Sequence, residues 1–239
     1  MSQLDKTITE VQSYARRFDS VLVSFSGGKD SLIVLDLCKK HFKKVVCFFM
    51  YAIPDLQFIN EQLEVSAKKY DVEILQYPHW AMFRWLKDMI YCDQYPFAED
   101  LPEVHLKDIY AQVRSDTGIQ LIATGFKKSD SMWRRRTTKR TTKVYGGSAF
   151  MTPIIEWNKF EVLAYLRINK IDPPPVMSGR TISGVDLTTP SILMIHDNYP
   201  EDFKKLLKIF PYAEAVVKRR EFYGEDFHTK RESANAKAT

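Results

Sequence analysis

The residues best suited to chemistry form one short run, SGGKDS, at residues 26–31. Its two glycines, Gly27 and Gly28, allow a tight turn and a close approach of the backbone to a ligand. Hydrophobic stretches precede and follow the run, so we expect a strand, the turn and then a helix. The free N–H groups and the dipole at the start of such a helix attract anions. Together with the Lys29 ammonium and the serine hydroxyls, they predict a phosphate-binding turn.

Two other phosphate-binding patterns do not fit the run. A Walker A loop requires a glycine five residues before its Gly-Lys pair and a serine or threonine directly after the lysine. Val23 and Asp30 occupy these places. The spacing of the two glycines also excludes the GxGxxG pattern. The turn is therefore of another kind.

Strand patterns alternate with helical patterns over roughly the first 150 residues. This alternation is typical of an α/β fold with a doubly wound, mainly parallel sheet. Ligands of such a sheet lie outside the carboxyl ends of the strands, near the point where the strand order reverses, and the two glycines fall at such an end. We expect strands at residues 21–25, 45–50, 72–75 and 119–123, and helices at residues 3–17, 32–38, 54–70, 79–91 and 104–115.

The rest of the chain is mostly helical in character. We expect an α/β domain at residues 1–150 with an N-terminal lead-in helix, a helical C-terminal portion at residues 151–228 packed on it, and a disordered tail at residues 229–239. The C-terminal portion is expected to contain an irregular loop at residues 176–188 and helices at residues 157–169, 190–197, 200–209 and 212–222.

The composition indicates a globular protein of a reducing compartment. The chain has 239 residues and a net charge of +5, which favours anionic ligands such as nucleotides or nucleic acid. The N-terminus lacks the apolar core of a signal peptide, and no apolar run reaches the roughly 20 residues of a membrane-spanning helix. The three cysteines form no CxxC pair, and the histidines lack zinc-binding spacing. We therefore expect a cytoplasmic protein with no zinc site and no membrane contact.

The run SGGKDS resembles the SGGxDS signature of the PP-loop ATP pyrophosphatases. Within that superfamily the chain is similar to the phosphoadenosine phosphosulfate (PAPS) reductase family, whose fold is that of the adenine nucleotide alpha hydrolases. Three other segments are more loosely similar. Residues 50–58 stand in the place of the family's DTGxEFPET, residues 123–131 with Arg134 resemble its GxRxxES…R loop, and residues 153–157 with Val162 resemble its PLxxW…V segment.

The resemblance implies a bound adenine nucleotide, which is ATP with Mg²⁺ or a sulfonucleotide (PAPS or adenylyl sulfate, APS). ATP would be cleaved between its α and β phosphates to adenylate a substrate in nucleic-acid or nucleotide modification. Lys29, Asp30 and Ser31 would be catalytic, and Asp30 would hold Mg²⁺ or instead cap the helix. The nucleotide-binding residues would be Ser24, Ser26, Gly27, Gly28, Lys29, Ser31, Met50, Gly125, Lys127, Arg134 and Arg135.

One functional group of the family is missing from this chain. A PAPS reductase attacks the sulfonyl sulfur with a cysteine near its C-terminus, in an ECGxH setting. The last cysteine here is Cys92, and residues 224–228 read GEDFH without a thiol. Cys38 and Cys47 fall in core elements, whereas Cys92 could be more exposed, although a lone thiol is most simply structural. Reductase chemistry is therefore disfavoured, and we expect no iron–sulfur cluster, which normally takes four ligands.

Two alternatives to an ATP pyrophosphatase stay open. One is an enzyme that binds PAPS or APS without the usual cysteine, and the other is a non-catalytic nucleotide- or nucleic-acid-binding module. The intact Lys29, Asp30 and Ser31 favour catalysis. The chain could also act as a homo-oligomer or with a partner chain that supplies a thiol.

A basic run, WRRRTTKRTTK at residues 133–143, follows the fourth expected strand. Its arginines would suit nucleotide phosphates, and the whole run would also suit a nucleic-acid backbone, with Trp133 as a stacking surface. A solvated loop is the third interpretation. We favour contact with the nucleotide or with an acidic substrate. Arg180, in the loop after the proline-rich stretch, is expected in a substrate lid, and Asp130 is a second metal ligand or a loop cap.

Overall fold

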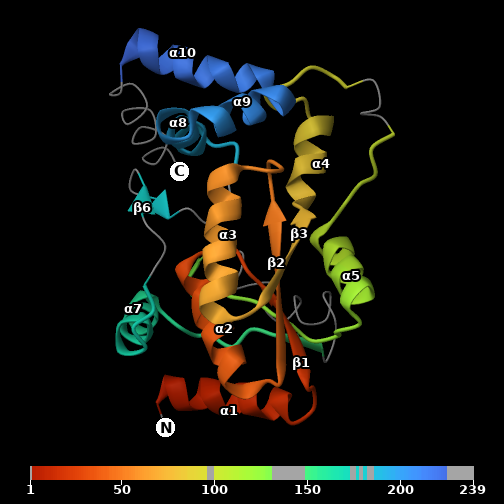
Figure 1. The fold of residues 1–239 in the computed structure, drawn as a ribbon, viewed down its shortest axis with the longest axis vertical. Coiled ribbons are helices and arrows are strands. Elements are labelled where there is room, and N and C mark those ends of the chain that lie inside the picture. Colours follow the sequence, from red (N-terminus) through yellow and green to blue (C-terminus); the bar gives the residue numbers. More distant parts are fainter. Residues whose placement is uncertain are drawn as a thin grey trace.

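A five-stranded parallel sheet with the order β3-β2-β1-β4-β5 forms the centre of the described part of the chain (Figure 1). Its strands are β1 (Ser20–Ser24), β2 (Lys44–Tyr51), β3 (Glu73–Pro78), β4 (Ile122–Ala123) and β5 (Phe150–Met151). This computed structural model describes residues 2–95, 100–130, 149–172 and 186–224, and the backbone of residues 176–177 and 180–181. The parallel sheet and its covering helices confirm the doubly wound α/β class.

The first strand, β1, lies in the middle of the sheet, and the later strands are added on both sides of it. β1 pairs with β2 on one side, and β2 pairs with β3. On the other side β1 pairs with β4, which pairs with β5. The strand order therefore reverses between β1 and β4, and that is where ligands of such sheets bind.

The central strands are buried on both faces, which explains their continuous hydrophobic sequences. Val21 and Val23 of β1 join one core cluster, together with Cys47 of β2. Leu22 of β1 and Phe48 of β2 point to the opposite face and join a second cluster. This period of two is the geometry of a strand, and here it divides the core into two layers.

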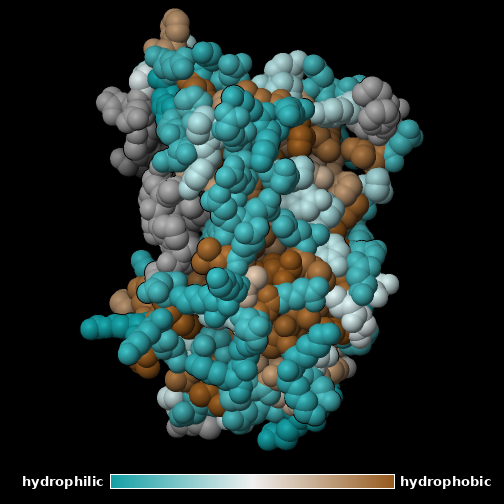
Figure 2. Space-filling model, viewed as in Figure 1, coloured by the Kyte–Doolittle hydropathy of each residue, from teal (hydrophilic) through white to brown (hydrophobic). Residues whose placement is uncertain are grey.

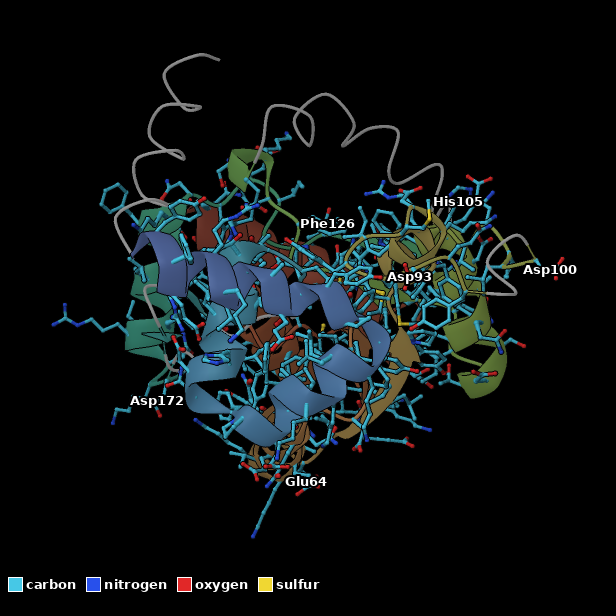
Figure 3. All side chains as sticks on the ribbon, turned by 90° about the horizontal axis from the view of Figure 1, so that it is seen from above. Glu64, Asp93, Asp100, His105, Phe126 and Asp172 are labelled. Carbon is cyan, nitrogen blue, oxygen red and sulfur yellow. The ribbon has the colours of Figure 1, made fainter. Side chains whose placement is uncertain are left out.

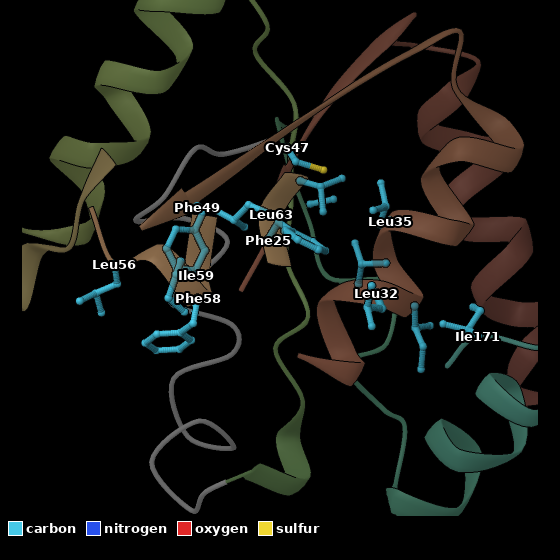
Figure 4. Packing of buried hydrophobic residues seen from close by; sticks show 14 of the residues in the cluster. Phe25, Leu32, Leu35, Cys47, Phe49, Leu56, Phe58, Ile59, Leu63 and Ile171 are labelled. Atoms are coloured by element: carbon cyan, nitrogen blue, oxygen red, sulfur yellow. The ribbon is translucent and has the colours of Figure 1, made fainter. Parts of the chain in front are cut away.

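Helices cover both faces of the sheet. They are α1 (Gln3–Ala15), α2 (Lys29–His41), α3 (Gln57–Tyr70), α4 (Trp80–Lys87), α5 (Leu106–Thr117), α7 (Lys159–Ile168), α8 (Thr189–Asn198), α9 (Pro200–Ile209) and α10 (Glu214–Tyr223), with the 3-10 helices η1 (Lys128–Asp130) and η3 (Pro211–Ala213). The larger cluster contains residues of α1, α2, α3 and α7, and the smaller one contains residues of α5. In Figure 4, Phe25, Phe49 and Ile59 lie together in the larger cluster, and Leu32 and Leu35 lie on the side of Ile171.

The turn predicted from SGGKDS leads directly into α2. Gly27 has a φ of 73°, in the left-handed region that favours glycine. Gly28 is the N-cap residue of α2, with an extended backbone. The apolar residues 32–35 of the helix are buried. Strand, turn and helix are thus confirmed in the predicted order.

Three details differ from the sequence-based expectation. α3 begins at Gln57 rather than at Pro54, because Asp55 has a φ of 55° and cannot belong to the helix. α4 ends at Lys87 rather than at residue 91, because Met89 and Tyr91 have φ values of 54° and 57°. In the stretch expected to be an irregular loop, β6 (Val176–Met177) and β7 (Arg180–Thr181) form an antiparallel pair.

The helices α8, α9 and α10 lie together at the end of the molecule toward which β2 points, and α1 lies at the opposite end (Figure 1). Asp202 of α9 connects them to the sheet layer. Its carboxylate, on a residue only 2% exposed, accepts hydrogen bonds from the backbone N–H groups of Gln57 (2.8 Å) and Phe58 (3.0 Å) at the start of α3. The boundaries at residues 150 and 228 stay predictions.

The visible surface is mainly hydrophilic (Figure 2). Hydrophobic atoms also reach the surface where α7 lies, and Phe160 and Ile168 of this helix are 83% and 75% exposed. Among the described helices, none combines the length and the apolar character needed to cross a membrane.

Candidate active site

A cleft of about 440 Å³ opens at the carboxyl ends of the parallel strands. Its walls come from the last residues of β1 and β2, from the residues that follow β1, β3 and β4, from the start of α2, from α4 and from Asp186. Phe126, which lines the cleft, lies near the centre of the view from above, whereas Glu64 and Asp172 lie at the periphery (Figure 3). The cleft includes the point where the strand order reverses, as the sequence analysis predicts.

The turn between β1 and α2 is held by its own serine side chains. The Gly28 N–H donates to Ser26 Oγ at 3.4 Å, and Ser26 Oγ donates to Ser31 Oγ at 3.3 Å. Ser31, only 3% exposed, donates in turn to the Gly28 carbonyl at 2.8 Å. These bonds therefore fix the shape of the turn. Such preorganisation lowers the entropy that binding must cost.

A buried cation stands beside this turn. The Lys127 side chain is 5% exposed, and its ammonium forms ion pairs with the carboxylates of Asp30 and Asp130, the latter at 3.1 Å. The Lys127 N–H also donates to the Asp130 carboxylate at 3.2 Å. We call Asp30, Lys127 and Asp130 the carboxylate–lysine cluster. Lys127, which the sequence predicts at the phosphates, thus lies next to Asp30. Its ion pairs connect the loop after β4 to the start of α2.

Asp30 does not cap α2, so that interpretation of the residue is wrong. The N-cap position belongs to Gly28, which has no side chain to cap the helix, and Asp30 lies in the first turn. The Asp30 Oδ2 atom faces Lys127 and, at 3.4 Å, the ammonium of Lys29. Its Oδ1 atom is buried and has no hydrogen-bond partner among the described residues.

Gly125 brings the loop after β4 close to the same residue. A Cβ atom added to Gly125 would lie 3.1 Å from the backbone carbon of Asp30 and 3.2 Å from its Cβ. A side chain larger than hydrogen would thus push the loop away from α2. The predicted site residue Gly125 therefore has a close-approach role that the structure makes explicit.

Ser24 and Met50, both predicted at the nucleotide, line the cleft. The sequence analysis does not find Thr124, which directly precedes Gly125. Thr124 is 1% exposed, lines the cleft, and its hydroxyl has no hydrogen-bond partner in the described ranges. A buried polar group without a partner is costly unless a ligand or water satisfies it. Its position at the end of β4 is the signal that could have identified it.

An aromatic group of residues lines another part of the cleft. Phe49, His79 and Trp85 contribute side chains there. The His79 and Trp85 rings are nearly parallel, at 11°, with centroids 6.4 Å apart. Burial lowers the pKa of His79 below its usual value, so the neutral imidazole is favoured. The sequence analysis assigns no site role to His79.

Asp186 brings the C-terminal portion to the cleft. Its Oδ1 atom accepts hydrogen bonds from the Thr188 hydroxyl at 2.6 Å and from the Ser191 hydroxyl at 2.5 Å. These bonds orient the carboxylate just before α8. No motif marks this residue in the sequence.

Comparison with known families agrees with this geometry. The family model described as the phosphoadenosine phosphosulfate reductase domain matches residues 20–183, well over half of the chain. The chain belongs to this family.

The fold comparison points in the same direction as the PAPS reductase family match. The structure is similar to an NH3-dependent NAD synthetase from Campylobacter jejuni, solved with a nitrate ion, with a TM-score of 0.50 and 16% identity. The similarity covers 94% of this chain and 97% of that chain. At this identity it supports the fold alone. Among curated proteins, no sequence matches significantly.

One segment that resembles the PAPS reductase family has a structural role here. Trp157, 2% exposed, donates from its indole to the Thr7 hydroxyl at 2.9 Å, and Thr7 donates to the Pro153 carbonyl at 3.0 Å. Ile154 of the same segment is fully buried. The segment at residues 153–157 therefore attaches α1 to the chain after β5 and does not line the cleft.

The family resemblance implies Mg²⁺, and Asp30 fits a ligand for it. Its buried, unpartnered Oδ1 atom offers one acceptor beside the phosphate-binding turn. Mg²⁺ on a nucleotide keeps several waters and takes only one or two carboxylates in addition to phosphate oxygens. It does not require the larger ligand clusters, of which the described residues contain none.

All three thiols are buried. Burial raises the pKa of Cys47 to about 12 and also raises that of Cys38 well above its usual value. Cys92, which the sequence analysis treats as potentially more exposed, is 3% exposed, so that expectation is wrong. Thiols with raised pKa values are poor nucleophiles because little thiolate forms.

Some predicted site residues lie outside the described residues. They are Arg134, Arg135, the rest of the basic run at residues 133–143, and the side chain of Arg180. Their roles stay predictions.

Proposed function

We propose that this member of the PAPS reductase family is a PP-loop ATP pyrophosphatase. An acceptor oxygen attacks the α-phosphorus of ATP, the bond from that phosphorus to the α–β bridging oxygen breaks, and pyrophosphate leaves. The acceptor gains AMP and loses a proton. The observation that carries the proposal is the preorganised turn at the strand-order reversal, with Thr124 unpartnered beside it.

The residues of the turn have distinct roles in this proposal. The N–H groups at the start of α2 and the Ser26 hydroxyl bind pyrophosphate oxygens, where negative charge grows as the bond breaks. Lys29, with a side chain 40% exposed at the mouth of the turn, neutralises the leaving group. Asp30 holds Mg²⁺ on the nucleotide. Ser31 keeps the turn in shape through its bond to Gly28.

The acceptor belongs to nucleic-acid or nucleotide modification in this proposal. The net charge of +5 suits an anionic partner, and the basic run stands between β4 and β5 in the sequence. We also propose that the protein is cytoplasmic and that it acts as a homo-oligomer or with a partner chain. The division of the chain at residues 150 and 228 is likewise a proposal.

A second candidate is an enzyme that binds PAPS or APS, and the family match favours it. The buried thiols count against the reductase reaction itself. Calorimetric titration distinguishes the two candidates, because a sulfonucleotide enzyme should bind PAPS much more tightly than ATP. Equal or weaker binding of PAPS would eliminate this candidate.

The test of the proposed function is product analysis. Labelled ATP and Mg²⁺, with a panel of DNA, RNA and nucleoside acceptors, should give AMP and pyrophosphate. Release of ADP and phosphate would contradict the proposal. Lys29→Ala should reduce turnover strongly, whereas Lys128→Ala should not. The two lysines are a matched pair because both side chains are 40% exposed.

A further inference from the structure

The cleft has two ends of different chemistry. Hydroxyl groups of Ser26, Ser31 and Thr124 gather near the ends of β1 and β4, beside the turn. The aromatic rings of His79 and Trp85 lie beyond the ends of β2 and β3. β3 and β4 are three strand spacings apart in the sheet. Their carboxyl ends, which mark the outer limits of the aromatic and hydroxyl groups, are therefore about 14 Å apart.

A nucleoside triphosphate has the same polarity, with phosphates at one end and a flat base at the other. If the phosphates occupy the turn, as in the proposed function, the base lies toward β2 and β3. Phe49 and Met50 supply apolar contacts there. His79 is the polar side chain that β3 and α4 bring to this end of the cleft.

Both the backbone and the ring of His79 are held in place. The backbone N–H of His79 donates to the Tyr51 carbonyl at 2.8 Å, which continues the pairing of β2 and β3. The Ala81 N–H donates to Nδ1 at 3.1 Å. The ring lies beside Trp80 at 5.4 Å as well as parallel to Trp85.

These contacts also determine where the proton is. Because Nδ1 accepts a hydrogen bond, the proton of the neutral ring is on Nε2. Burial keeps the ring neutral, as the lowered pKa indicates. Within the described ranges, the ring makes no hydrogen bond besides the one at Nδ1. Nε2 therefore carries a hydrogen that the described residues do not use, on a side chain that lines the cleft.

We propose that His79 is a specificity-determining residue that donates a hydrogen bond from Nε2 to N1 of an adenine base. The inference rests on the proposed function only in placing the phosphates at the turn. A donor at this point favours adenine on the Watson–Crick edge, because N1 carries a lone pair in adenine and a hydrogen in guanine. Trp85 and Phe49 supply the flat apolar surroundings that a base requires.

The alternative is that His79 only caps α4. An asparagine separates the two roles, because its side-chain oxygen also caps a helix well. His79→Asn thus keeps the cap and removes the ring and its donor. His41→Asn is the matched control, since His41 is at the last turn of α2, away from the strand ends that form the cleft.

The experiment is a set of binding titrations with ATP and with its 1-deaza, 3-deaza and 7-deaza analogues. In the unaltered protein and in His41→Asn, the 1-deaza analogue should bind about 5–10-fold more weakly than ATP, the effect of one hydrogen bond. In His79→Asn, ATP should lose about the same factor, and that analogue should no longer differ from ATP.

Two results would overturn the inference while leaving the proposed function intact. The 1-deaza analogue could bind the unaltered protein as tightly as ATP, or its deficit could persist in His79→Asn. Failure of ATP to bind the unaltered protein would instead refute the proposed function, and with it the placement of the base. Thermal unfolding of His79→Asn at neutral pH, expected close to that of the unaltered protein, shows that the fold is intact.

Discussion

The carboxylate–lysine cluster makes a quantitative prediction for Lys127→Met. Methionine fills most of the space of the buried lysine stem but removes the cation between Asp30 and Asp130. Removing one partner of a fully buried ion pair costs about 3–5 kcal/mol. The two carboxylates are 23% and 28% exposed, so water can partly solvate them. We therefore expect a loss of about 3 kcal/mol, toward the low end of that range.

The assay is thermal unfolding of the variant beside a control at the next residue. For a protein of this size, about 3 kcal/mol lowers Tm by about 6–12 °C. Lys128→Met breaks the pair of Lys128 with Glu156, whose side chains are 40% and 50% exposed. An exposed pair contributes at most about 1 kcal/mol, so Tm should fall by less than about 4 °C.

A second variant tests the electrostatic reason itself. In Lys127→Met with Asp30→Asn, the carboxylate charge that Lys127 no longer offsets is removed together with the cation. This double variant should be more stable than Lys127→Met alone. If Lys127→Met is no less stable than Lys128→Met, or if the second change brings no recovery, the cluster does not stabilise the fold as argued. A loss of ATP affinity without a loss of stability would instead favour direct contact of Lys127 with phosphate.

Further predictions concern the close approach, a helix cap and pH. Gly125→Ala should weaken ATP binding, and the loss of binding free energy should exceed the loss of unfolding free energy, because the new Cβ displaces the start of α2 at Asp30. Unchanged affinity in titrations would contradict this prediction. Asp202→Ala should cost about 2–3 kcal/mol, since two N–H groups of α3 lose a buried acceptor, and denaturant titration should detect it. The folded-state pKa of His79 is lowered, so the unfolded chain binds more protons and Tm should fall as pH decreases below about 6.5. His79→Asn should reduce that fall, and an identical pH profile for the variant would show that another group causes it.

The sequence was sufficient for the parts of the fold with a clear local signal. The central strands are buried on both faces, so their hydrophobic runs are unmistakable, and the two glycines mark the turn into α2. β5 has only two residues, Phe150 and Met151, and pairs with β4 across a long sequence separation. The helix boundaries at Asp55 and Met89 depend on positive φ values, which non-glycine residues adopt only under tertiary contacts.

The sequence predicted the site residues that lie in continuous motifs. It did not predict those that folding brings together from distant segments. Ser26, Asp30 and Gly125 lie in segments similar to the family motifs, and all three line the cleft. His79 follows β3 and Asp186 precedes α8, and nothing in their local sequence shows that they line the same cleft. Their convergence depends on the strand order and on the packing of the C-terminal helices over the sheet.

The charge balance of the turn explains why a phosphate-binding motif contains an aspartate. A carboxylate at the start of a helix is compatible with the dipole, but beside phosphate it would repel the ligand. Lys29 and Lys127 face Asp30 and offset its charge, and Asp130 offsets one of these lysines in turn. The side chains around the turn are thus formally neutral, so the N–H groups of α2 supply the remaining attraction for the anion. A cation that arrives with the nucleotide can therefore use Asp30 Oδ1 without competing for Oδ2, which the two lysines already hold.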